Sequence, residues 1–272
     1  MNISNVSKIV LALSLAASGA AAAGEKEVSD SDRITQYREM ISDGNPADFD
    51  EMAGEELWKK PAGPKKATLE KCDLGKGAGV VKGAYAELPR YFKDTNKVQD
   101  LESRLMTCMS TLQGIPEEEI AAKPFSSEQK KSDISSLATY VVGQSKGIKM
   151  NVSVKHPMEK EAYEIGKRIF NYRAGPYDFA CSTCHATSKV RIRMQDLPNL
   201  NDPKDAQAAY TTWPAYRVSQ GLTRSFQWRL NDCFRQQRFP EPKFASEATI
   251  ALTMFLAVNA NGAEYAGPGL KR

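Results

Sequence analysis

Three segments of the chain carry apolar residues at the helical spacing i, i+3, i+4, i+7 and i+8. Their apolar positions are Ile134, Leu137, Ala138, Val141 and Val142; Ala162, Ile165, Gly166, Ile169 and Phe170; and Ala248, Ala251, Leu252, Phe255 and Leu256. Ser246 is a suitable N-cap for the third segment. The alternation typical of strands is scarce, so the pattern predicts a mainly α fold with long loops.

The chain also reads as two degenerate copies of one unit. A stretch from Gly143 to Pro157 contains Gly and Lys and shows no helical spacing, which indicates a linker. On either side of it the same signals recur in the same order: a Leu-Pro pair, an R-L-x-x-C motif and a closing helix. The pairs are Leu88-Pro89 and Leu197-Pro198, and the motifs run from Arg104 to Cys108 and from Arg229 to Cys233. We therefore predict two tandem domains, residues 24–145 and residues 146–272.

The N-terminus has the features of a secretory signal peptide. Lys8 is the single charge in residues 1–23, an apolar run follows from Ile9 to Ala17, and small residues end at Ala23. A membrane anchor is the alternative, but the run is too short for about 30 Å of hydrocarbon. We expect cleavage after Ala23, export to the periplasm and no membrane span.

The charge distribution and the cysteine content limit which functions the chain can have. The 272 residues carry a formal net charge of +4, and the charges are mixed along the chain without a long basic block. This distribution gives no indication of nucleic-acid binding. Five cysteines are an odd number for an oxidising compartment, so at least one needs a role other than a disulfide.

Cys181, Cys184 and His185 form a C-x-x-C-H motif. In this motif two thiols add to the haem vinyl groups and the adjacent imidazole binds the iron. A zinc site would need two more ligands, and His156 is the only other histidine. A redox C-x-x-C belongs in a βαβ unit, whereas this motif follows a predicted helix. We therefore predict a c-type cytochrome with one covalent haem c.

The predicted helices on either side of this motif suit a small cytochrome c domain. Gly166 on the helix before the motif would let the last helix cross closely, near Leu252 and Phe255. The alternative is that these residues are ordinary core positions, which is compatible with the same fold.

The first half lacks an intact copy of the haem motif. If Cys72 corresponds to the first cysteine, Gly75 replaces the second and Lys76 replaces the histidine. This half then attaches no haem by that route, and Cys72 with Cys108 is the available pair for a disulfide. Closing a loop of about 37 residues would contribute about 3–4 kcal/mol in the chain-entropy model. The alternative is two buried thiols.

Cys233 is the leading candidate for the second axial ligand of the haem iron. It lies before the closing helix, where the distal ligand of a cytochrome c is expected, and a thiolate there would hold the reduction potential low. Met194 follows the motif too closely to reach the other haem face, and Met254 lies on the closing helix. His156 is the rival ligand, and a buried free thiol is the other interpretation of Cys233.

Arg229 precedes Cys233 by one helical turn, so the two would share a helix face if the segment is helical. A guanidinium at that place favours a thiolate and can bind an oxyanion. The alternative for Arg229 is a solvated surface charge.

Together these residues resemble the SoxA family, the catalytic cytochrome subunits of L-cysteine S-thiosulfotransferase in bacterial thiosulfate oxidation. The resemblance extends from about Asp30 to Gly267 and rests on the second-half C-x-x-C-H, the R-x-x-x-C that ends at Cys233 and a first copy without haem. The C-x-x-C-H alone indicates only haem, whereas the combination is specific for the family.

The resemblance implies a role for each of these residues. Cys181 and Cys184 would be the thioether links and His185 the proximal ligand. Cys233 would be both the distal ligand and the catalytic cysteine, found in the family as a persulfide, and Arg229 would bind the substrate. Because Gly75 and Lys76 break the first motif, the chain is similar to the single-haem type, with Cys72 and Cys108 bridged.

The implied reaction is oxidative conjugation of thiosulfate to a cysteine of the carrier protein SoxYZ, on its SoxY subunit, with release of two electrons. A haem takes up one electron at a time, so a second haem is needed, and the family supplies it in the small cytochrome partner SoxX. The competing interpretations are a plain electron-transfer cytochrome c, which predicts a Met or His sixth ligand, and a haem sensor of sulfur species.

Overall fold

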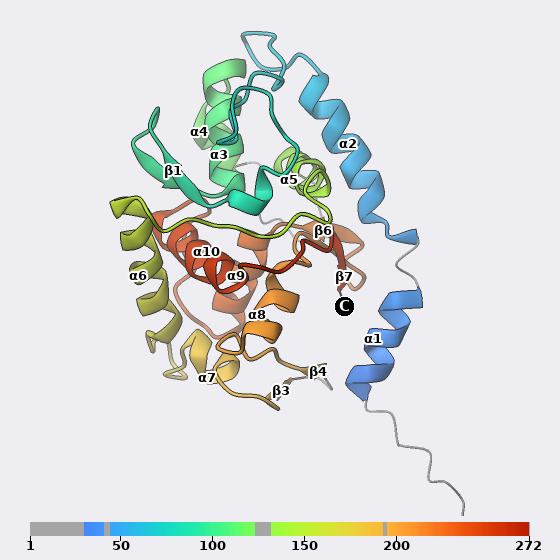
Figure 1. Cartoon of the computed structure of the whole chain (residues 1–272), viewed down its shortest axis with the longest axis vertical. Helices are drawn as coiled ribbons and strands as arrows, with labels where there is room; N and C mark the ends of the chain where they lie inside the picture. The colour runs from blue at the N-terminus through green and yellow to red at the C-terminus, as the bar shows by residue number, and fades with distance from the viewer. Residues whose placement is uncertain (1–29, 41–43, 123–131, 193–194, 272) are drawn as a thin grey trace, which may run out of the picture.

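The computed structural model describes residues 30–40, 44–122, 132–192 and 195–271 (Figure 1). The signal peptide predicted for residues 1–23 lies outside this part of the chain. The described residues form a mainly helical fold with short strands, as the apolar spacing predicts. In Figure 1 the blue and green elements α2 to α5 lie above, and the yellow to red elements α6 to α10 lie below.

The first half is built on two helices that cross, α2 and α5. After α1 (Asp30–Met40), its elements are α2 (Ala47–Lys59), η2 (Tyr85–Glu87), β1 (Arg90–Phe92), β2 (Lys97–Gln99), α3 (Leu101–Cys108), η3 (Met109–Gln113), α4 (Glu117–Ala122) and α5 (Asp133–Gly143). β1 and β2 form an antiparallel hairpin that leads into α3. The helix predicted around Leu137 is α5.

The second half repeats the long first helix, the hairpin, the helix with the R-L-x-x-C motif and the closing helix, and it adds further strands. Its elements are α6 (Pro157–Asn171), α7 (Cys181–His185), β3 (Arg191–Ile192), β4 (Gln195–Asp196), α8 (Pro203–Tyr210), β5 (Ala215–Arg217), β6 (Leu222–Arg224), α9 (Phe226–Gln236), α10 (Glu247–Asn259) and β7 (Gly269–Lys271). β5 pairs antiparallel with β6 and parallel with β7. Ser246 is the N-cap of α10, as predicted.

A glycine allows the long helices of each half to cross closely. A Cβ on Gly166 of α6 would lie 2.0 Å from the backbone oxygen of Ala251 and 2.9 Å from Cβ of Phe255 on α10. A Cβ on Gly54 of α2 would meet the backbone oxygen of Ser136 on α5 at the same distance, 2.0 Å. The predicted crossing of α6 and α10 is confirmed, and it has a twin in the first half, α2 against α5.

The hairpin and the helix after it correct one of the predicted repeats. Pro89 immediately precedes β1 and Pro214 immediately precedes β5, and each hairpin leads into the helix with the R-L-x-x-C motif. The counterpart of Leu88-Pro89 is therefore Trp213-Pro214. Matching it to Leu197-Pro198 was wrong, because Pro198 lies on the loop between β4 and α8.

The turn before the haem motif corrects a second match. Ala62-Gly63-Pro64 follows α2 and Ala174-Gly175-Pro176 follows α6, and each turn is closed by a bridge, Ala62 to Ala67 and Ala174 to Phe179. Both turns stand at the same distance from the crossing glycine. Carried forward at the same spacing, this register places Cys72 opposite Cys184, Leu69 opposite Cys181 and Asp73 opposite His185. The first half has thus lost the first cysteine and the histidine, whereas the match to Gly75 and Lys76 was wrong.

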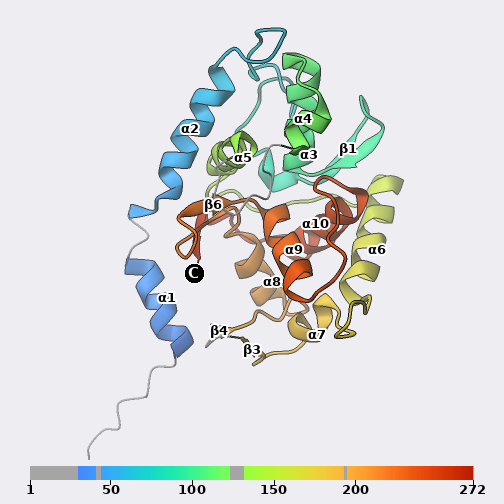
Figure 2. The ribbon, with the colours of Figure 1, turned by 180° about the vertical axis from the view of Figure 1, so that it is seen from behind.

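The two halves share one continuous buried core, which runs from Trp58 to Tyr265. The segment between α5 and α6 is hydrogen-bonded to both halves. The N–H of Met150 donates to Ala263 O at 2.8 Å in the second half, and the N–H of Asn151 donates to Ala86 O at 2.7 Å in the first half. Across the junction α2 and α5 contact β6, and α6 contacts β1 and β2, an arrangement that Figure 2 shows from behind. Among the described residues, none of the helices has the length and apolar character needed to cross a membrane.

Candidate functional site

The C-x-x-C-H motif forms the short helix α7, which follows the turn at the end of α6. The Thr183 hydroxyl accepts the Ala180 N–H at 2.9 Å and so closes the first turn of α7. Ala180 itself is buried, which holds the start of α7 against the core. This anchoring keeps Cys181 and Cys184 one turn apart on one short helix, the arrangement that two thioether links to a single haem require.

His185 is held in one orientation by the loop that follows it. Its Nδ1 donates to the Pro198 carbonyl at 2.9 Å, and its own carbonyl accepts the Leu200 N–H at 2.7 Å. A proton on Nδ1 leaves the lone pair of Nε2 for a metal. The sequence contains this contact residue in the Leu197-Pro198 pair, which the repeat pattern alone does not connect with His185.

Cys233 and Arg229 lie together on α9, confirming that this segment is helical. Ser225 caps the helix by accepting the Trp228 N–H at 3.2 Å. Cys233 is a partly buried free thiol, and the side chain of Arg229 is one quarter exposed. Arg229 is therefore accessible, whereas most of α9 is buried.

Asp232 fixes the arginine, and the sequence interpretation had not singled it out. Its carboxylate accepts Arg229 Nη1 at 2.8 Å and Gln236 Nε2 at 2.8 Å, and it also pairs with Arg235. The signal in the sequence was an acidic residue three positions after an arginine on a helix. The remaining donors of Arg229 give this site a cation on the same side as Cys233.

These residues shift one another's pKa values, which indicates that they lie close together. Burial raises the pKa of the Cys181 thiol to about 12, and the neighbouring Cys233 adds to this increase. Burial and then Cys233 also raise the pKa of Cys184. Burial lowers the pKa of His185, the bond to Pro198 opposes this, and the charge of Arg229 lowers it further. The pKa of Arg229 is raised, first by Cys233 and then by Asp232.

This donor set fits a haem c. It offers two thiols on one helix, an imidazole whose Nδ1 is already bonded, and a third thiol on the facing helix α9. The rival ligands lie elsewhere. His156 is the N-cap of α6, and its ring centre lies 3.8 Å from that of Tyr91. Met254 is fully buried in the core. Met194 lies outside the described residues. The assignment of Cys233 as axial ligand stays a prediction.

In the first half, the two cysteines at the corresponding positions are joined by a disulfide. Cys72 and Cys108 form a disulfide with their Cα atoms 5.5 Å apart. They stand opposite Cys184 and Cys233, so the bond joins the two positions that are free thiols in the second half. The predicted pairing is present in the structure, in place of two buried thiols.

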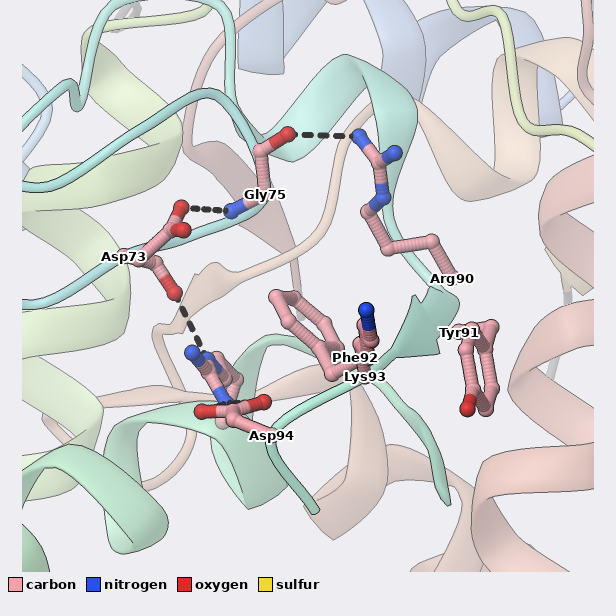
Figure 3. A pocket seen from close by; sticks show the side chains of 8 residues that line it. Asp73, Gly75, Arg90, Tyr91, Phe92, Lys93 and Asp94 are labelled. Atoms are coloured by element: carbon pink, nitrogen blue, oxygen red, sulfur yellow. Dashed lines mark hydrogen bonds and ion pairs between the residues drawn. The ribbon is translucent and has the colours of Figure 1, made fainter. Parts of the chain in front are cut away.

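Arg104, the counterpart of Arg229, has a structural role. Its Nε donates to the Asp73 carbonyl at 2.6 Å, its Nη1 donates to the Asp94 carboxylate at 2.8 Å, and its guanidinium lies 4.0 Å from the ring centre of Phe92. The cavity beside it, about 610 Å³, is lined by polar and aromatic side chains (Figure 3). Figure 3 also shows Arg90 reaching the Gly75 carbonyl, a bond of 2.7 Å.

Comparison with known proteins agrees with these features. The family model for the cytochrome c domain of SoxA and TsdA matches residues 53–150. The SoxA subunit of L-cysteine S-thiosulfotransferase from Hydrogenophilus thermoluteolus is 52% identical over 251 residues, which cover 92% of each chain. A subunit of the same name from Hydrogenobacter thermophilus is 34% identical and covers 84% of this chain and 82% of its own.

A solved structure has the same fold. A chain in the crystal structure of SoxXA from P. pantotrophus matches with a TM-score of 0.72 at 21% identity, covering 87% of this chain and 84% of that one. Sequence identity over most of both chains, together with a haem motif and a facing R-x-x-x-C, leads to one conclusion. The chain belongs to the SoxA family of L-cysteine S-thiosulfotransferase subunits.

Proposed function

We propose that this chain is the haem-bearing catalytic subunit of an L-cysteine S-thiosulfotransferase, which joins thiosulfate to a cysteine of a SoxYZ-type carrier protein. One observation carries the proposal: Cys233 and Arg229 lie on one helix within electrostatic reach of the C-x-x-C-H motif. A plain electron-transfer cytochrome would need no reactive cysteine and no accessible arginine at this place.

The chemistry divides into two steps at the Cys233 sulfur. In the first, the outer sulfur of thiosulfate bonds to the Cys233 thiolate with loss of two electrons, while Arg229 binds the sulfonate through charge-assisted hydrogen bonds. In the second, the carrier thiolate attacks that outer sulfur and Cys233 leaves as a thiolate. The net change is one new S–S bond, one proton released from the carrier thiol and two electrons removed.

A haem c bound here would take up the electrons one at a time. The residues that would hold it are Cys181 and Cys184 through thioethers, His185 through Nε2 and Cys233 through its sulfur. We propose one haem in this chain, since Leu69 and Asp73 stand where the first half would need a cysteine and a histidine. A SoxX-type cytochrome would then accept the electrons. The similarity to a chain of a SoxXA complex supports this partner.

The proposed division of the chain follows the repeated contacts. Residues 24–145 would form the haemless cytochrome c-like domain and residues 146–272 the haem-binding one, each built around a crossing at a glycine, Gly54 or Gly166. Residues 1–23 would be removed on export to the periplasm.

Cys233→Met tests the mechanism. Cys181, Cys184 and His185 are untouched, so covalent haem should remain, whereas the low-spin spectrum should change from thiolate to thioether character and the reduction potential should rise. Thiosulfate conjugation to the carrier should be abolished, because a thioether cannot carry a transferable sulfur. The measurements are a pyridine haemochrome assay, a redox titration and mass analysis of the carrier. Full activity in Cys233→Met would refute the proposal in favour of an electron-transfer role.

A further inference from the structure

The two helices that carry the R-L-x-x-C motifs meet at their first turns. Glu102 on α3 and Gln227 on α9 occupy the same position in the two copies. The Gln227 backbone N–H donates to Glu102 Oε1 at 3.3 Å, and its side-chain amide donates to Asp100 Oδ2 at 2.5 Å. Its side-chain oxygen accepts the Ala245 N–H at 2.7 Å. Gln227 thus joins the start of α9 to the haemless half.

These contacts are cut off from water. Asp100 is 1% exposed, Glu102 4% and Gln227 0%. Asp100 is also the N-cap of α3, accepting the Ser103 N–H at 3.0 Å. Two carboxyl groups therefore stand side by side in the buried junction, both engaged with the first turn of α9.

The groups that face this pair from the neighbouring elements supply hydroxyls. Two of these groups are titratable, Tyr210 from α8 and Tyr85 from η2. Both are buried, and burial is the main cause that raises the pKa of each. The Ser225 hydroxyl reaches Glu102 as well. The adjacent cation on β6 is Arg224, whose guanidinium donates to Gln220 at 2.9 Å and lies 4.7 Å from the ring centre of Trp228.

The electrostatic consequence is that one of the two carboxyl groups stays protonated. Burial raises the pKa of Glu102 to about 7, and the charge of Asp100 adds to the increase. Burial raises the pKa of Asp100 too. Two adjacent carboxylates in a medium of low dielectric repel strongly, so one of them keeps a proton up to neutral pH.

We propose that Asp100 and Glu102 of the haemless half are positioning residues for α9, and that the proton retained by this pair controls the placement of Arg229 and Cys233. This inference rests on the proposed function. With the proton in place the pair holds the first turn of α9. Loss of the proton leaves two facing anions, and their repulsion loosens that turn. Arg229 and Cys233 follow Gln227 within two helical turns, so a movement of the turn carries them with it.

The test compares the haem-loaded full chain with two variants, Glu102→Gln and the control Glu159→Gln. The glutamine at 102 keeps an oxygen for the Gln227 N–H and removes the titration. Glu159 is another buried carboxylate between the halves, accepting the Tyr91 N–H at 3.0 Å, but it lies on α6, away from the first turn of α9. The probe is the low-spin electron paramagnetic resonance and visible spectrum of the haem, followed from mildly acidic to mildly alkaline pH.

The wild type and Glu159→Gln should show one spectral transition near neutral pH, and Glu102→Gln should keep the acid form throughout. The same transition in Glu102→Gln, or none in the wild type, would overturn the proposal. If Glu102→Gln yields no holoprotein, Asp100→Asn replaces it. Removing the charge of Asp100 should move the transition to lower pH, and an unchanged midpoint would count against the pair. Because thiosulfate is not needed, failure of conjugation would leave this result interpretable.

Discussion

At the scale of single residues, two arginines in identical motifs have different roles because their neighbours differ. Arg104 meets Asp94 and the Asp73 carbonyl, which bind its Nη1 and Nε, and its side chain is 5% exposed. Arg229 meets Asp232 through one nitrogen and is 25% exposed. The copy that keeps free donors at the surface is the one beside the free cysteine.

Arg229→Ala should lower kcat/KM for thiosulfate without changing the haem ligands. Loss of a charge-assisted contact to the sulfonate costs about 1.5–3 kcal/mol, or about ten- to a hundredfold in kcat/KM for thiosulfate. The matched control is Arg235→Ala, which removes the other arginine on Asp232 but lies beyond Cys233 on α9. Steady-state kinetics with the carrier protein measure both. Equal losses in the two variants would show that Asp232, not substrate binding, explains the effect.

At the scale of elements, the packing of the second half depends on how closely α6 and α10 approach each other. Gly166 brings the backbone of α6 against Ala251, and Phe170 and Phe255 pack at 5.3 Å between ring centres beside it. The loop of residues 172–180 joins α6 to α7, so the crossing also helps to place the C-x-x-C-H motif. The equivalent crossing at Gly54 places the turn that leads to Cys72.

Gly166→Ala should destabilise the protein despite the better helix propensity of alanine. The new Cβ would meet backbone atoms of α10, and overpacking of this kind costs about 1–3 kcal/mol, against a gain of about 1 kcal/mol from propensity. Thermal unfolding measures the change. Gly44→Ala is the control, because a Cβ there meets nothing within 4 Å. Equal melting temperatures for Gly166→Ala and wild type would mean that the helices separate freely.

At the scale of the whole molecule, one half carries the C-x-x-C-H motif and the other half packs against it in a common core. The first half contains the disulfide between Cys72 and Cys108, and its Glu102 and Asp100 accept hydrogen bonds from Gln227 at the start of α9. The continuous core means that the two halves do not behave as independent modules. The copy without a C-x-x-C-H motif therefore keeps a structural role.

The exported chain should contain one haem c and one disulfide. Leu69 and Asp73 cannot attach or ligate a haem as cysteine and histidine do, and Cys72 is bonded to Cys108. A pyridine haemochrome assay counts the haem, and peptide mapping without reduction detects the linked cysteines. Two haems per chain, or both cysteines recovered as free thiols, would contradict the assignment.

The sequence alone determined the features that depend on local spacing. The C-x-x-C-H, the turn from Arg229 to Cys233 and the three apolar stripes are short-range patterns, so α5, α6 and α10 were predicted correctly. α2 and α3 were not predicted. The buried positions of α2 include Asp50 and Gly54, and every residue of α3 is buried, so neither has the apolar stripe that marks an amphipathic helix.

The tertiary structure decided which residues correspond and which meet. The match of Cys72 to Cys184 follows from two turns that lie at the same distance from a helix crossing, whereas Cys72 taken alone as the first cysteine of the motif favours the other register. The contact between Glu102 and Gln227 joins residues 125 positions apart. Spacing along a chain specifies neighbours within a few turns, whereas contacts between distant segments are set by how the helices pack.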